Sequence, residues 1–362
     1  MLPRFPHWPQ PRIIAMKFLR QPMSLLDFEF TQHALHFPQL RLWFDAHRKQ
    51  GPGQLVFVSH AHSDHTARHA EVVLTGPTQK LMAIRLGGQR QTHVLPFGER
   101  FDLRDPRFGV PREAYLTLWP AGHILGSAMA RLEADGRSLL YTGDFKLRDG
   151  LSAEKCQPVQ ADLLVMETTF GKPRYIFPPT SAVLDQLIQF CRSVRAADQV
   201  PVVLGYSLGK AQELLLALGA AGEPIMVHET ISRMNAVYAE FGQPMPTLRD
   251  WDPAAARGHV VLAPPGAALD ALKQHHPVRV AVVTGWAMDP GCHFRYRADA
   301  SFPLSDHADF PDLLEFVRQV APKTVYTLHG FAGEFATQLR RRGYDARALT
   351  ERDQFELALG DT

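Results

Sequence analysis

The chain has 362 residues, of which 45% are hydrophobic and 21% are charged. This is the composition of an ordinary globular protein, and the length allows one or two domains. No stretch approaches the roughly 20 apolar residues of a membrane-spanning helix, and the N-terminus lacks the apolar core of a signal peptide. The net charge of +2 neither requires nor excludes a nucleic-acid partner. Three widely separated cysteines, Cys156, Cys191 and Cys292, argue against disulfides and a cysteine-based zinc site, and favour a cytoplasmic location.

Strands and turns dominate the first half of the chain. Runs of β-branched and other apolar residues predict strands over 55–59, 71–76, 115–122 and 162–170. A further segment, 129–143, carries apolar runs on both sides of Asp135-Gly136. Because Asp-Gly favours the two-residue turn of a β-hairpin, this segment is predicted to form one.

From about residue 178 to 300, strands alternate with longer helices. After a helix at 181–197, strand, loop and helix follow one another at 201–221 and again at 224–242, before strands within 260–266 and 278–285. This alternation predicts a parallel, doubly wound sheet. A helix at 309–322 and a strand at 323–330 come next. The simplest architecture is an α/β sandwich interrupted by an inserted α/β module, with the last elements returning to the first lobe.

A cluster of metal-ligand side chains follows the strand predicted at 55–59. The stretch VSHAHSDH (58–65) places His60, His62, Asp64 and His65 in one loop. Strand alternation sends His60 and His62 in the same direction, and the other two follow where the chain turns, so all four can converge. Neutral imidazole and carboxylate suit zinc or a similar divalent ion.

One loop cannot complete two coordination spheres, so further ligands are expected at strand ends downstream. His123, Asp144 and His329 each end a predicted strand. A carboxylate such as Asp144 can bridge two ions about 3.5–4 Å apart that hold a hydroxide for attack on phosphate. The expected sets are His60, His62, His123 and Asp144 around one metal, and Asp64, His65, Asp144 and His329 around the other.

Longer motifs carry a family resemblance. HAHSDH (60–65), GHILGS (122–127) and YTGDF (141–145), in this order, resemble the metallo-β-lactamase fold. METTFG (166–171), YSLGKAQ (206–212) and PLSDHADF (303–310) resemble the nucleic-acid-processing branch with the β-CASP insertion. That branch includes DNA cross-link repair nucleases, the cleavage-and-polyadenylation nuclease and ribonuclease J. The basic segment before PLSDHADF is most similar to that of the bacterial ligase-associated DNA exonucleases.

The resemblance implies a metallo-β-lactamase αββα sandwich with an inserted α/β β-CASP domain. The expected divisions are an N-terminal extension over 1–40, the first part of the lactamase lobe over 41–175, the insertion over 176–300 and the returning part over 301–362. The resemblance also makes Asp45 a support for the metal loop and Glu167 the acidic residue that orients His307. The last motif residue, His329, is histidine in RNA-processing members and is often apolar in cross-link repair nucleases.

Together, these features predict a metal-dependent DNA exonuclease that hydrolyses phosphodiester bonds through a hydroxide activated by two metals. His307, backed by Glu167, is expected to protonate the leaving oxygen, and Asp64 is counted as catalytic as well as a ligand. The cofactor is expected to be a pair of divalent ions, zinc first, with manganese and magnesium as alternatives. The family resemblance alone adds DNA repair with an associated ATP-dependent ligase and helicase.

Two further groups of residues are candidates for phosphate contacts. YSLGKAQE (206–213) runs from a strand into a helix, where free N–H groups, the Ser207 hydroxyl and the Lys210 ammonium could receive a phosphate. Ordinary strand-to-helix capping is the equally weighted alternative. Arg295 and Arg297, shortly before His307, could hold the nucleic-acid backbone, and such contacts set affinity rather than sequence preference.

Three rival functions stay open at this point. A ribonuclease of the same chemistry is favoured by His329. Hydrolysis of a small thioester or lactam could use the same metal ligands, but the long insertion and the His307–Glu167 pair argue against it. A catalytically silent scaffold subunit is the third, and the intact set of ligands argues against that.

Overall fold

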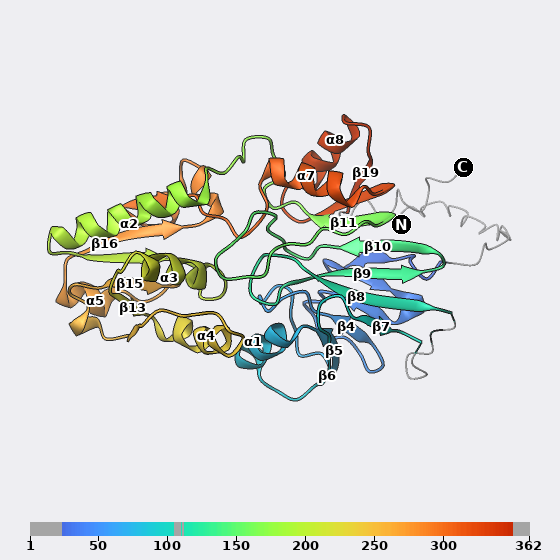
Figure 1. Ribbon diagram of the computed structural model, residues 1–362, viewed down its shortest axis with the longest axis horizontal. Helices are drawn as coiled ribbons and strands as arrows, with labels where there is room; N and C mark the ends of the chain where they lie inside the picture. The colour runs from blue at the N-terminus through green and yellow to red at the C-terminus, as the bar shows by residue number, and fades with distance from the viewer. Residues whose placement is uncertain (1–23, 105–109, 111, 350–362) are drawn as a thin grey trace, which may run out of the picture.

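The computed structural model describes residues 24–104, 110 and 112–349, so residues 1–23 of the predicted N-terminal extension lie outside the described residues. Three sheets organise the described chain (Figure 1). The first has the order β1-β2-β3-β4-β5-β6. Its strands are Glu29–Thr31, Ala34–Phe37, Leu42–Phe44, Leu55–Phe57, Glu71–Leu74 and Gln91–Val94. Strands β1 and β2 therefore join this sheet, although the sequence assigned them to the extension.

The second sheet has the order β19-β18-β11-β10-β9-β8-β7. In chain order, its strands β7 to β11, β18 and β19 are Arg100–Asp102, Ala114–Pro120, Ala128–Ala134, Arg137–Tyr141, Leu163–Glu167, Thr324–Leu328 and Asp345–Ala348. Strands β9 and β10 pair antiparallel around Asp135-Gly136, as the sequence predicts. Strand β18 pairs in parallel with β11, so the last part of the chain does return to the first lobe.

Alternation along strand β4 explains how the layers of this lobe pack. Leu55 and Phe57 enter the core between the first two sheets, whereas Val56 and Val58 pack on the opposite face with helix α1 (Gly76–Leu86). A strand that is buried on both faces has a continuous run of apolar residues in its sequence. Helices α7 (Phe310–Val320) and α8 (Ala332–Arg340) cover the outer face of the second sheet. The result is the predicted αββα sandwich.

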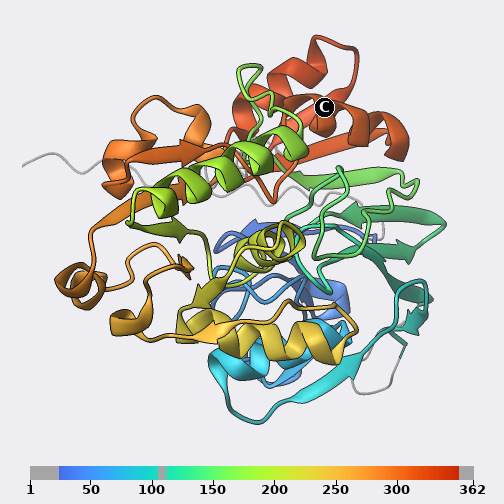
Figure 2. The ribbon, with the colours of Figure 1, turned by 60° about the vertical axis from the view of Figure 1, so that its left-hand side comes forward.

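The third sheet, with the order β14-β13-β15-β12-β16-β17, forms the other end of the molecule (Figures 1 and 2). All its strand pairs are parallel, as predicted for the insertion. Strands β12 to β17 are Val200–Leu204, Ile225–Val227, Arg249–Asp250, Val260–Ala263, Val278–Val283 and Ala300–Phe302. Helices α2 to α6 are Thr180–Ala196, Lys210–Ala220, Glu229–Glu240, Asp270–His275 and Cys292–Tyr296.

The two lobes share part of their apolar core. Tyr238 of α4 and Leu208, both from the inserted module, pack in one buried cluster with Ile124 and Leu125 of the first lobe. The Tyr238 hydroxyl also accepts a hydrogen bond from the Leu125 backbone N–H at 3.4 Å. Loops of both lobes therefore meet in a fixed arrangement, and the site described below lies at this junction.

Candidate metal centre and active site

The loop after β4 is anchored by one buried carboxylate. Asp45 accepts hydrogen bonds from the Ser59 backbone N–H at 2.7 Å and from the Tyr141 hydroxyl at 2.9 Å. It also accepts from the Ser59 hydroxyl at 2.5 Å and from His65 Nδ1 at 2.8 Å. A residue that fixes both ends of a short loop orients every side chain on it, which is the supporting role expected for Asp45.

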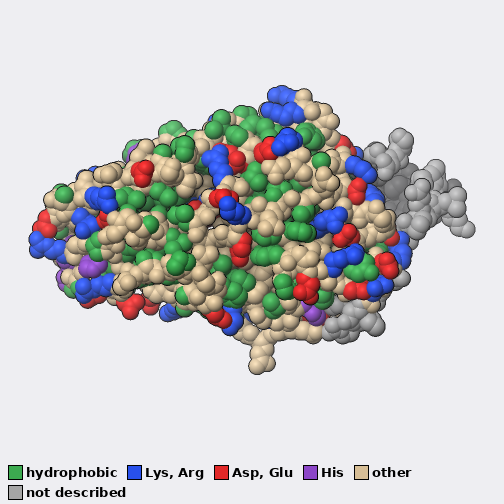
Figure 3. Space-filling view, viewed as in Figure 1, with side chains coloured by type: hydrophobic (Ala, Val, Ile, Leu, Met, Phe, Trp, Pro, Cys, Tyr) green, Lys and Arg blue, Asp and Glu red, His purple; other side chains and the backbone are tan. Residues whose placement is uncertain are grey.

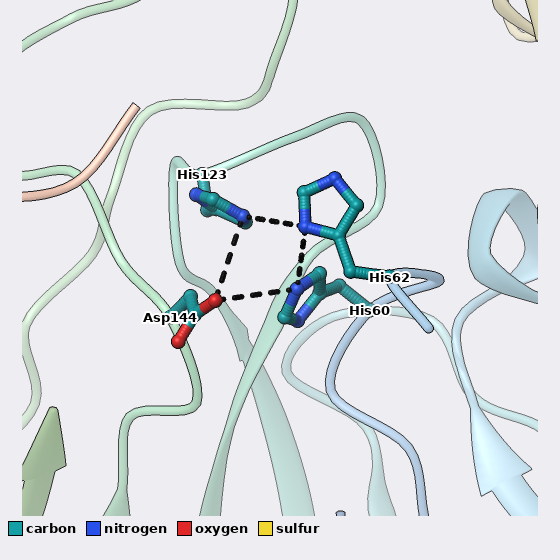
Figure 4. Close-up of side chains that lie close together, drawn as sticks. All are labelled: His60, His62, His123 and Asp144. Atoms are coloured by element: carbon teal, nitrogen blue, oxygen red, sulfur yellow. Dashed lines mark hydrogen bonds and ion pairs between the residues drawn. The ribbon is translucent and has the colours of Figure 1, made fainter. Parts of the chain in front are cut away.

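Four of the predicted ligands form a compact set, shown in Figure 4. His62 Nδ1 lies 3.0 Å from His60 Nε2 and 3.1 Å from His123 Nε2. Asp144 Oδ2 lies 3.5 Å from His60 Nε2 and 3.8 Å from His123 Nε2. We call these four residues the compact set. Their ligand atoms all lie within 4.8 Å of one another.

The three imidazoles of the compact set each donate their outward N–H to a fixed oxygen. The partners are the Ser59 hydroxyl for His60 Nδ1 at 3.0 Å, the Leu208 carbonyl for His62 Nε2 at 3.1 Å and the Asp306 carbonyl for His123 Nδ1 at 2.7 Å. Because a neutral imidazole has a single N–H, the inward nitrogens carry lone pairs. Lone pairs this close repel unless a cation lies among them, so the donors fit a divalent metal ion.

The charge states in the compact set also suit a cation. Burial lowers the pKa of His60, of His62 (to about 4) and of His123, so these rings are neutral near pH 7. Burial would raise the pKa of Asp144, but the neighbouring imidazoles of His65 and His307 outweigh it and hold that pKa well below its usual value. Neutral imidazoles and an ionised carboxylate are the forms that bind metal.

The remaining predicted ligands, Asp64, His65 and His329, together with the shared Asp144, are called the open set here. His65 Nε2 lies 3.3 Å from Asp144 Oδ2 and 3.9 Å from Asp64 Oδ2. The Asp64 side chain is 78% exposed, and the rings of His329 and His65 are 6.0 Å apart between centroids. His65 thus contacts the Asp144 carboxylate of the compact set, and Asp64 and His329 lie near His65.

A carboxylate–imidazole pair lies beside the compact set. Glu167, which is fully buried, accepts a hydrogen bond from His307 Nδ1 at 2.8 Å and others from the backbone N–H groups of Phe145 and Thr169. The ring of His307 stands 4.7 Å from that of His123. Burial alone would lower the pKa of His307, but the charges of Glu167, Asp144 and Asp306 outweigh it, Glu167 first, and raise this pKa to about 10. His307 thus keeps a proton on Nε2, the nitrogen that Glu167 leaves free.

Comparison with known proteins agrees with this geometry. Residues 297–349, which include His307 and His329, match the family model "Zn-dependent metallo-hydrolase RNA specificity domain". The chain is 50% identical over 335 residues to "Probable DNA ligase" of Opitutus terrae, an alignment that covers 92% of this chain and 32% of the relative. It is 28% identical over 290 residues to "5' exonuclease Apollo" of Gallus gallus, covering 77% of this chain and 59% of the relative.

An "RNase J-like protein" of Methanocaldococcus jannaschii is 28% identical over 213 residues, which are 51% of this chain and 50% of the relative. By these matches the chain resembles the metallo-β-lactamase β-CASP nucleases, and its described residues have their fold. It spans only about a third of the ligase-named relative and about half of the RNase J-like one. A solved protein of unknown function from Enterococcus faecalis has the same fold, with a TM-score of 0.57 and 13% identity over 84% of this chain and 81% of that one.

The site opens into a cavity of about 760 Å³ lined by both lobes. Ser207 lines the cavity, as do Asp64, His307 and His329. Arg295 and Arg297 are exposed, at the end of α6 and just after it, and are outside the residues that line the cavity. The face drawn in Figure 3 carries scattered charges of both signs.

Lys210 does not occupy the position predicted for it. Its side chain is 1% exposed, and its ammonium lies 3.7 Å from Asp306 Oδ1 and 3.9 Å from Glu213 Oε2. The phosphate contact predicted from YSLGKAQE does not fit this placement, because the α3 N-terminus turns the lysine inward. Lys210 instead neutralises Asp306, and together with nearby imidazoles it outweighs burial and lowers the pKa of that carboxyl.

Asp306 is the site residue that sequence reasoning missed. Its carbonyl orients His123, and its Oδ1 lies 4.0 Å from His307 Nε2. The signal was present, because Asp306 directly precedes His307 in LSDHADF.

Within the described part of the chain, no helix combines the length and apolar character that a bilayer span requires.

Proposed function

We propose that this chain is a metal-dependent DNA exonuclease that hydrolyses phosphodiester bonds with the help of two divalent ions, zinc first among the candidates. The observation that carries the proposal is the convergence of three lone-pair nitrogens and one carboxylate at a cavity that His307 also lines. Bound in this site, divalent ions would neutralise the charge of a phosphate and lower the pKa of water so that hydroxide is available near pH 7.

The chain's own residues supply the rest of the chemistry. The compact set, which includes Asp144, fixes where the phosphate is held. The hydrogen bonds behind its three imidazoles keep these ligands from turning away. His307 then gives its Nε2 proton to the departing oxygen, a poor leaving group unless protonated. The Glu167 carboxylate, hydrogen-bonded to Nδ1 behind the ring, stabilises the protonated form until that transfer.

DNA as the substrate and repair as the setting rest on the relatives. The ligase-named relative aligns with 92% of this chain, although that alignment is only 32% of the relative. This is the pattern expected if the two activities act together. The 5' exonuclease relative supports an action on chain ends. The helicase partner follows from the family resemblance alone, and a cytoplasmic location from the cysteine pattern.

A ribonuclease is the second candidate. The matched family model is described as an RNA specificity domain, and it covers the segment that carries His307 and His329. The RNase J-like relative points the same way. The chemistry proposed above is the same for either nucleic acid.

Digestion of end-labelled strands tests the proposal. Matched DNA and RNA oligonucleotides, single-stranded and duplex, with and without a 5′-phosphate, are incubated with the purified protein and zinc or manganese. We expect mononucleotides to be released from a DNA end. Exclusive cleavage of RNA would favour the ribonuclease, and internal DNA fragments would contradict the exonuclease assignment.

A further inference from the structure

The inserted sheet contains a topological switch point that faces the site. Strand β12 lies between β15 and β16. After β12 the chain runs through α3 to β13, on the β15 side, whereas after β16 it runs through α6 to β17, on the other side. In open parallel sheets, adjacent strands whose connections leave in opposite directions form a crevice at their carboxyl ends, and ligands bind there.

Each of the two switch-point loops carries an aromatic side chain into the cavity. Tyr206 follows the end of β12 and Trp286 follows the end of β16, and both line the cavity. Tyr206 is 48% exposed, so its ring faces open space. A hydrogen bond with the Tyr296 side chain restrains it. Trp286 packs against Phe170, with 4.8 Å between the ring centroids.

The loops after β12, β15 and β16 contribute only uncharged side chains to the cavity lining: Tyr206, Ser207, Leu208, Pro264, Pro265, Thr284, Gly285 and Trp286. The loop after β17 adds Ser305, Asp306 and His307. Charged and imidazole ligands lie instead on the first-lobe side of the cavity. An uncharged aromatic wall suits the π-face of a base far better than a phosphate, which needs cations or N–H donors.

Short contacts tie this wall to the reacting centre. The loop that carries Tyr206 also carries the Leu208 carbonyl, which accepts from His62 Nε2 at 3.1 Å. The Phe170 ring that contacts Trp286 is 6.2 Å from that of His307 between centroids. A group held on the wall is therefore next to whatever phosphate the metal ligands hold.

We propose that Tyr206 and Trp286 form a stacking site for an unpaired nucleobase adjacent to the scissile phosphate. The inference rests on the proposed nuclease function and deepens it, because it names single-stranded ends as the preferred substrate. Every base has a π-face, so the site selects unpaired nucleotides with little preference among the four bases. In a duplex, the same base must first leave its stack, which costs free energy.

An abasic series provides the test. Single-stranded DNA oligonucleotides carry one tetrahydrofuran residue at the first, second, penultimate or last nucleotide, so that the result does not depend on cleavage polarity. We expect wild type to lose about 5- to 150-fold in kcat/KM at one of these positions. Tyr206→Ala should lose a similar factor in kcat/KM on the strand that carries all of its bases. On the abasic strand to which wild type is sensitive, the variant should lose almost nothing further. The loss should lie mainly in KM, because stacking is present before and during the reaction.

Matched variants separate stacking from damage to the fold. Tyr206→Phe and Trp286→Phe keep a ring and should retain most of the activity, whereas Trp286→Leu should behave like Tyr206→Ala. Phe294→Ala removes a ring that is 75% exposed and lies outside the cavity lining, so it should match wild type. The stacking site would be overturned if Tyr206→Ala lost the same factor in kcat/KM on intact and abasic strands, or lost no activity at all. If wild type with metal cleaves none of the strands, it is the nuclease function that fails.

Discussion

The compact set and the open set share Asp144 but differ in how far the protein alone organises them. In the compact set, each imidazole is neutral and is turned inward by an oxygen behind it. In the open set, only His65 is held in this way, by Asp45, while Asp64 is exposed and His329 stands apart. Hydrogen bonds behind a ligand fix its geometry before metal arrives. The compact set is therefore preorganised, whereas the side chains of the open set must move together when a metal binds.

The protonation of the two sets differs as well. Burial favours neutral His65, but the carboxylates of Asp144 and Asp45 outweigh it and raise its pKa well above the usual value. His65 is therefore protonated near pH 7 until a metal displaces that proton. A ligand that must lose a proton binds metal more weakly as pH falls. We infer that the compact set fills first and that filling of the open set depends more strongly on pH.

Removal of the shared carboxylate should have the largest effect. Asp144→Ala takes a ligand from both sets, so we expect the metal content to fall and turnover to drop by at least about 10³-fold. Metal analysis by mass spectrometry, together with the oligonucleotide assay, measures both. Thermal unfolding of the metal-free protein serves as the folding control. A variant that keeps two metals would show that Asp144 does not join the sets.

His307→Ala should separate chemistry from metal binding. His307 stands outside both sets and acts on the leaving oxygen, so we expect metal content to stay at the wild-type level while kcat falls by about 10²- to 10⁴-fold. Single-turnover kinetics on a labelled strand measures the loss. Normal cleavage by a fully metal-loaded variant would remove His307 from the mechanism.

Asp45→Asn should affect the open set more than the compact set. Asn cannot hold His65 with a full negative charge, and loss of such support typically lowers metal affinity about 10- to 100-fold. Calorimetric titration with zinc should show the affinity of the second site weakened more than that of the first. Equal weakening of both sites would contradict the division into two sets.

Glu167→Gln should change the pH profile rather than abolish activity. Glu167 contributes most, with Asp144 and Asp306, to the raised pKa of His307, about 10, so the wild-type acid stays protonated across neutral pH and is lost only as pH rises through that value. Without the Glu167 charge, burial lowers the pKa, and the alkaline fall in kcat/KM should begin at lower pH. At pH 7 the loss should be smallest, and at pH 9 we expect about tenfold or more. An unshifted alkaline limb would refute the role of Glu167.

The sequence predicted the fold and the compact set because both depend on local patterns. A two-sided apolar strand followed by HAHSDH specifies β4 and its loop, and Asp135-Gly136 specifies the hairpin that delivers Asp144. It missed β1 and β2, which are short and join the sheet through distant pairing with β3. It also could not place Lys210, because whether that side chain points to solvent or to Asp306 depends on how the inserted module meets the first lobe.

The central claim is that the inward nitrogens of His60, His62 and His123 hold a cation together with Asp144. The direct test is a crystal of the protein grown with zinc or manganese, with anomalous diffraction recorded at the metal edge. The account predicts a strong peak in contact with all four ligand atoms and a second, pH-dependent peak between Asp144 and His65. No peak among the four residues at saturating metal would contradict it.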